Sequence, residues 1–215
     1  MQLNMKKTFI SIATVVMAIC LVACNKEDWN LEPAGGDLAA LNNGHSYVDL
    51  GLSVKWASCN IGATDPWEAG NFFAWGETTS KESFTTDTYT HPEAESLTLT
   101  NDAAFTNWGG TWRMPTAEEI QELLDKCTWK YAKYPNSNVY GYKVTSRVEG
   151  FTRNYIFLPV TGYKDGAGLC STDAGYYWSA NSNKAYPKSL YFTSRKNECQ
   201  DATPYYGYAV RAVCK

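Results

Sequence analysis

The sequence has few of the residues and motifs on which catalysis and metal binding usually depend. Only two histidines are present, His45 and His91, and neither lies in an H-E-x-x-H motif. The chain contains no G-x-S-x-G motif, and no two cysteines have the C-x2-C spacing of a metal site. We therefore expect no cofactor, no metal ion and no enzymatic activity.

A long hydrophobic run and an excess of basic charge are also missing. The apolar run from Phe9 to Val22 is shorter than the roughly 20 residues that a membrane-spanning helix needs. The formal net charge is −3, with 19 basic and 22 acidic side chains. A mildly acidic chain gives no general reason to expect a nucleic-acid partner.

The N-terminal segment has the order of a cleaved secretory signal. Lys6 and Lys7 precede the apolar run, and the small-residue sequence "LVAC" ends it. This ending resembles a bacterial lipobox, which implies that residues 1–23 are removed and that Cys24 is acylated. The alternative is an ordinary signal peptide in which the cysteine is incidental.

The residues after Cys24 predict where the protein is sent. The sequence "NKED" is similar to the export signal of lipoproteins on the outer face of some Gram-negative cells, although a charged linker would look the same. We expect an outer-membrane, surface-exposed protein that is anchored in lipid through Cys24. Residues 24–44 carry Pro, Gly and Asn without a hydrophobic period, which predicts a flexible tether.

Residues 45–215 are enough for one domain with a substantial hydrophobic core. Of the seven cysteines in the chain, Cys20 lies in the predicted signal peptide and Cys24 is the predicted acylation site. The domain therefore has five thiols, an odd number: Cys59, Cys127, Cys170, Cys199 and Cys214. An oxidising compartment permits disulfides, and at least one thiol stays unpaired. Spacing alone does not determine which cysteines pair.

The pattern of the domain predicts short strands and a single convincing helix. The helix is predicted within "RMPTAEEIQELLDKCTW", where Thr116 and Glu119 form a capping box and apolar residues follow at helical spacing. Alternation in "YVDLGLSVKWASCNIG" predicts strands near the start. Five further strand-like pieces are "YGYKVTS", "NYIFLPVTGY", "GYYWSA", "SLYFTS" and "GYAVRAV". This order favours an α+β fold with long irregular loops.

An ordered set of motifs resembles a known family. The stretches "FFAWGE", "NWGGTWRMPTAEEIQELL", "IFLPVTGYKDG" and "YGYAVRAV" look like the Fibrobacter succinogenes major paralogous domain, a cell-surface module, and the likeness covers nearly all of 45–215. The block "WRMPT" also resembles formylglycine-generating enzymes. The resemblance implies a C-type-lectin-like fold in which the two ends of the domain pair, and a disulfide between Cys59 and Cys127.

The C-terminal part of the domain has the composition of a binding face. Its stretches "NSNKAYPKS" and "SRKNECQDATPYY" are rich in Asn, Ser, Lys, Thr and Tyr, as paratopes are, with ordinary surface turns as the alternative. The frame is similar to variable proteins of diversity-generating retroelements. It departs from their pattern at Lys196, Glu198, Cys199 and Pro204, which fit a fixed paralogue equally well. Carried over by position, the resemblance implies these ligand-binding residues: Asn181, Asn183, Lys184, Tyr186, Lys188, Arg195, Asn197, Asp201, Tyr205 and Tyr206.

The predicted function is recognition of a protein or glycan ligand by these C-terminal loops at the cell surface. One alternative is a structural or tip subunit of a surface assembly, in which the same face packs on a neighbouring protein. A second alternative is a carbohydrate-active enzyme, which would require a cleft with two close carboxylates.

Overall fold

The computed structural model describes residues 40–90 and 94–215. Strands hold 39% of the described residues and helices 13%, and the strands form curled antiparallel sheets. The predicted α+β, C-type-lectin-like class is therefore wrong, and the protein is β-rich. The prediction failed because it treated several polar stretches as loops although they pair as strands. The predicted signal peptide, Cys24, most of the predicted tether and His91 lie outside the described residues.

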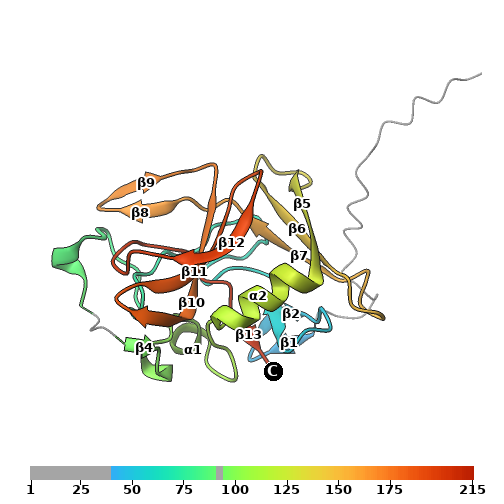
Figure 1. Ribbon diagram of the computed structural model, residues 1–215, viewed down its shortest axis with the longest axis horizontal. Helices are drawn as coiled ribbons and strands as arrows, with labels where there is room; N and C mark the ends of the chain where they lie inside the picture. Colours follow the sequence, from blue (N-terminus) through green and yellow to red (C-terminus); the bar gives the residue numbers. More distant parts are fainter. Residues whose placement is uncertain (1–39, 91–93) are drawn as a thin grey trace, which may run out of the picture. The chain divides into compact units, whose positions relative to one another are not determined.

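The strands of the described region form four sheets (Figure 1). The first contains, in spatial order, β1 (Leu41–Asn42), β2 (His45–Val48), β3 (Lys55–Ala57) and β13 (Val213–Cys214). The second contains β12 (Asn197–Asp201), β11 (Pro187–Phe192), β10 (Gly175–Lys184) and β4 (Ala94–Ser96). The third contains β5 (Cys127–Lys133), β6 (Tyr140–Ser146) and β7 (Tyr155–Pro159), and the fourth β8 (Tyr163–Asp165) and β9 (Gly168–Cys170).

The helical elements are short. They are α1 (Ala103–Trp108), α2 (Ala117–Lys126) and two 3-10 helices, Thr86–Thr88 and Leu99–Asn101. Pairing of β3 with β13 confirms that the two ends of the domain come together, and β1 extends the first sheet into the range of the predicted tether. None of the described helices is long and apolar enough to cross a membrane.

Helix α2 begins as its sequence predicts. The Thr116 hydroxyl accepts a hydrogen bond from the Glu119 amide at 3.2 Å, and Glu119 accepts one from the Thr116 amide at 2.8 Å. The Glu119 carboxylate also binds the Arg113 guanidinium through both oxygens, at 2.5 and 2.7 Å. Burial opposes the charge, but the hydrogen bonds from Arg113 and Thr116 outweigh it and lower the pKa of Glu119. The start of α2 is thus fixed by a partly buried ion pair.

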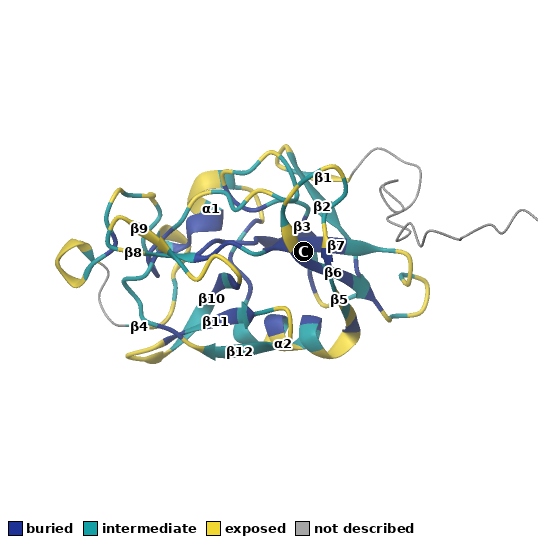
Figure 2. Ribbon diagram, turned by 90° about the horizontal axis from the view of Figure 1, so that it is seen from above, coloured by how far each residue is buried: buried dark blue, intermediate teal, exposed yellow. Residues whose placement is uncertain are grey.

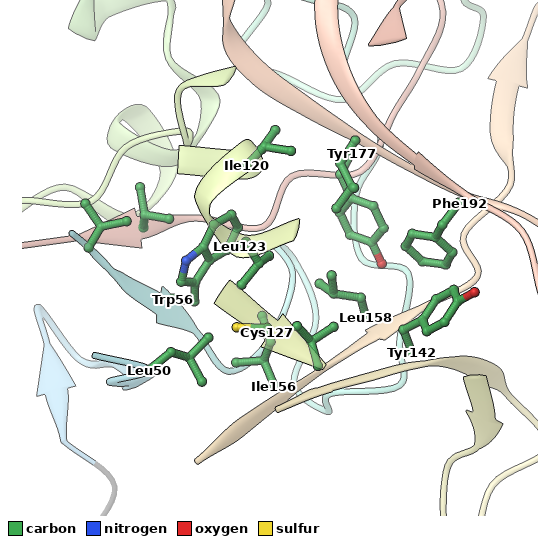
Figure 3. Close-up of a cluster of buried hydrophobic side chains, with 14 of the residues drawn as sticks. Leu50, Trp56, Ile120, Leu123, Cys127, Tyr142, Ile156, Leu158, Tyr177 and Phe192 are labelled. Carbon is green, nitrogen blue, oxygen red and sulfur yellow. The ribbon is translucent and has the colours of Figure 1, made fainter. Parts of the chain in front are cut away.

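One core cluster fills the space between α2, the third sheet and one face of the second sheet. Figure 3 shows Ile120 and Leu123 of α2 near Leu158 of β7 and Tyr177 of β10. Each of these side chains is at most 2% exposed. Burying an apolar side chain of this size contributes about 1.5–3 kcal/mol, so this cluster fixes α2 against the sheets.

A second cluster lies on the opposite face of β10. Successive side chains of a strand point to opposite faces, so Tyr177 joins the first cluster while Trp178 joins the second. The Trp178 ring stacks on Tyr208 at 4.2 Å between centroids, and its indole N–H donates to the Phe73 carbonyl. Buried residues consequently follow β10 and β11 through the middle of the domain (Figure 2). The hairpin of these strands is supported from both sides.

The C-terminal segment from 207 to 214 is extended but mostly outside regular sheets. Isolated bridges join Tyr208 to Phe73 and Ala209 to Tyr177. Arg211 is 1% exposed and donates to the side chain of Asn60 at 2.7 Å and to the Phe157 carbonyl at 3.0 Å. Its guanidinium also donates to the carbonyls of Ala57, the last residue of β3, and of Ser58, so this one side chain links three distant segments.

Candidate functional site

The turn between β10 and β11 carries three exposed residues of the predicted ligand-binding set, Asn183, Lys184 and Tyr186. The Asn183 amide donates to the Tyr186 carbonyl at 3.2 Å, and the Asn183 side chain accepts from the Tyr186 amide at 3.1 Å. Lys184 takes a left-handed backbone conformation, with φ of 83°. These contacts close a tight turn in which the Tyr186 side chain is 54% exposed. We call residues 183–186 the hairpin turn.

A charged pair lies beside the hairpin turn. Lys188 of β11 faces Asp201 of β12, and their side chains form an ion pair at 2.7 Å. The hydrogen bond to Asp201 raises the pKa of Lys188. Asn183 also donates to the second oxygen of Asp201 at 3.3 Å. Three predicted residues therefore form one polar group at the end of the second sheet.

A small hollow adjoins the hairpin turn. Its volume is about 120 Å³, and its walls are Trp75, Tyr89, Lys184, Ala185, Pro187 and Pro204. The Tyr89 hydroxyl donates to the Trp75 carbonyl at 3.0 Å, and the Trp75 indole donates to the Ser179 carbonyl at 2.9 Å. These two hydrogen bonds fix the positions of Trp75 and Tyr89 in the wall of the hollow. The hollow can receive one apolar group of a ligand.

Tyr205 and Tyr206 lie in a separate group of tyrosine rings. Tyr206 is 4.9 Å from Tyr163 of β8, and Tyr163 is 5.0 Å from Tyr176 of β10, measured between ring centroids. Tyr205 contacts Tyr206 at 5.0 Å. The rings are half-buried, so they are partly structural and partly available to a ligand. Pro204 lines the hollow directly before them, which connects the two groups along the chain.

The other predicted residues lie elsewhere. The Asn181 side chain accepts a hydrogen bond from the Ala117 amide at 2.8 Å and so satisfies the start of α2. Asn197 pairs with Phe192, four residues along β11 from the Lys188 pair. At about 3.3 Å per residue this separates Asn197 from the Lys188–Asp201 pair by about 13 Å, and the hairpin turn lies farther still along the hairpin. The structure thus divides the ten predicted residues instead of bringing them into one site.

The cysteines of the described region are all free. Cys127 is buried in the first core cluster, whereas the Cys59 thiol donates to the Thr64 carbonyl at 3.4 Å. Burial raises the pKa of both thiols, to about 11 for Cys127. The structure therefore does not join the pair that the family resemblance implies. Within residues 40–90 and 94–215, no group of three or more His, Cys, Asp or Glu side chains could hold a metal ion.

Sequence reasoning missed Trp75 and Tyr89 as members of this site. They lie about a hundred residues before the hairpin turn, and only tertiary contacts such as the bond from Trp75 to Ser179 bring them there. The one signal was the stretch "FFAWGE", whose tryptophan suggests core or contact area without saying which.

Comparisons with known proteins add no identification. The chain matches no protein-family model, and neither curated proteins nor solved structures gave a significant match.

Proposed function

We propose that the protein is a surface lipoprotein that binds a protein or glycan ligand through the hairpin turn and the hollow beside it. The observation that supports this most strongly is the exposed side chain of Tyr186, whose chain neighbours Ala185 and Pro187 line the small hollow. Tyrosine provides a large contact area at a low cost in conformational entropy. Binding energy usually concentrates on such aromatic anchors.

The chemistry around the turn suits a ligand with both apolar and polar groups. Lys184 is three-quarters exposed and lies 3.6 Å from Glu95, a distance at which an exposed ion pair contributes little. Its ammonium group can therefore turn to a ligand at low cost. The Asn183 side chain is already bonded to Tyr186 and Asp201, so Lys184 supplies the free polar group and the hollow takes one apolar group. This combination is as suitable for a protein side chain as for the face of a sugar.

The structural-subunit alternative uses the same surface, since a neighbouring subunit would also need an exposed aromatic anchor. Stable purification of a stoichiometric partner together with the protein favours that alternative. The enzyme alternative would need two close carboxylates in a cleft. Two of the acidic residues, Glu77 and Glu119, are each engaged in an ion pair with a neighbouring side chain.

The surface location is tested on intact cells. Brief protease treatment of cells that express the protein is expected to remove it, and to remove with it the binding of labelled glycans or surface proteins. A Cys24→Ala variant should lack acylation and should leave the membrane fraction. If the protease cuts the protein in broken cells but leaves it whole in intact cells, the surface location is contradicted.

A further inference from the structure

A second, larger hollow lies next to the site already described. Its volume is about 470 Å³, within the range of about 300–1,000 Å³ that is typical of small-molecule sites. Gly76, Thr88 and Thr90 line it, while their chain neighbours Trp75 and Tyr89 line the small hollow. The two hollows are therefore separated by the same two segments of chain.

The walls of the large hollow are held in place by hydrogen bonds from other segments. Glu77 accepts from the amide and the hydroxyl of Thr90, at 2.9 and 3.2 Å. Asn101 donates to the Gly76 carbonyl at 3.3 Å, and Asn107 donates to the Thr78 carbonyl at 3.0 Å. A ligand would consequently meet a largely preformed surface.

The charge of the large hollow is balanced. Glu77 and Lys81 are the charged residues among those that line it, and they form an ion pair at 2.6 Å. Lys81 also donates to the Thr88 carbonyl at 2.7 Å. Because the carboxylate neutralises the ammonium group, the hollow has no net charge that would attract a phosphate or another anion.

Free hydroxyl groups give the large hollow its chemistry. Within the described residues, the side chains of Thr78, Thr79 and Ser80 make no hydrogen bond to other protein groups, and all three line the hollow. None of the residues that line it has a large apolar side chain, which argues against a lipid tail. Hydroxyls together with a neutral ion pair match the donors and acceptors of a neutral, polyhydroxylated ligand.

We infer that this hollow is a binding site for a neutral saccharide unit, distinct from the hairpin turn. Ligand hydroxyls donate to the Glu77 carboxylate and exchange hydrogen bonds with the hydroxyls of Thr79 and Ser80. The site binds a sugar without cleaving it, because Glu77 is the single carboxylate among the residues that line it and glycoside hydrolysis normally requires two.

The test is an NMR titration of the 15N-labelled full-length protein with methyl β-glucopyranoside, methyl α-mannopyranoside and methyl β-galactopyranoside. At least one of these should cause saturable shifts of the Thr78–Lys81 amides, and glucose 6-phosphate should bind no more tightly. A Thr79→Ala, Ser80→Ala double variant should weaken binding by about tenfold, which corresponds to about 1.4 kcal/mol.

Two controls make the titration decisive. Thr86→Ala removes an exposed hydroxyl that does not line the hollow and should leave binding unchanged. Tyr186→Ala changes the hairpin turn and should also leave it unchanged, which separates this inference from the proposed function. Absence of saturable shifts with all three glycosides, or equal binding by the double variant, would overturn the inference.

Discussion

Replacing Arg211 with alanine is expected to lower the free energy of unfolding by about 4 kcal/mol. The guanidinium is buried and donates to Asn60, Phe157 and two further carbonyls. Each buried acceptor that loses its donor costs about 1–3 kcal/mol, and partial access of water to the vacated space reduces the sum. Urea unfolding followed by tryptophan fluorescence measures the change.

Two further variants show what Arg211 contributes. Arg211→Met fills most of the side-chain volume but supplies no hydrogen-bond donor. If this variant is as destabilised as Arg211→Ala, the lost free energy of unfolding comes from the hydrogen bonds and not from a cavity. Arg211→Lys keeps the charge but loses the planar fork, so we expect an intermediate loss. A change below about 1 kcal/mol in the alanine variant would show that the buried guanidinium is not a major link between these segments.

Replacing Trp178 with alanine is expected to cost about 3–5 kcal/mol, because its side chain is fully buried against Tyr208. The hydrogen bond from its indole N–H to the Phe73 carbonyl contributes to stability as well, and replacing tryptophan with phenylalanine measures that contribution. Trp178→Phe leaves the Phe73 carbonyl without this donor. Trp56 is equally buried, but its indole N–H has no partner in the described residues, so Trp56→Phe should cost less.

The same unfolding measurements test this comparison. Equal losses in the two phenylalanine variants would show that the indole hydrogen bond of Trp178 contributes nothing beyond packing. An alanine loss below about 1 kcal/mol would contradict the central place of Trp178 in the second core cluster.

The sequence predicted those elements whose signals are local. The capping box of Thr116 and Glu119 placed the start of α2, because both groups belong to the same turn. The stretch 140–146 was predicted as a strand and is β6. Trp56, Trp112 and Trp178, which stand in apolar stretches of the sequence, are all buried.

Other elements depend on partners that are distant in sequence. Strand β12 has the sequence "NECQD", which has no strand-like alternation and forms a strand through its pairing with β11. Strand β10 continues to Lys184, through residues that read as a loop, because β4 and β11 pair on either side of it. Because β12 and the second half of β10 were not predicted as strands, the strand content was underestimated and the fold was assigned to the α+β class.

The candidate site was predictable only where local composition indicated it. The composition of the C-terminal stretches pointed to the hairpin turn, and Tyr186 is indeed exposed there. Composition did not reveal that the Asn181 side chain accepts a hydrogen bond from the backbone amide of Ala117 at the start of α2. Nor did it reveal that Arg195 and Asn197 lie at the far end of the hairpin formed by β11 and β12.

The central claim, that the hairpin turn is a ligand-binding face, is tested most directly by an array of glycans and of host and bacterial surface proteins. The purified protein is compared with a double variant, Lys184→Ala together with Tyr186→Ala, and with a control variant, Tyr140→Ala. The control removes another tyrosine ring, which is 48% exposed. We predict specific binding that is lost in the first variant and kept in the control. Absence of binding, or equal binding by all three proteins, would contradict the claim.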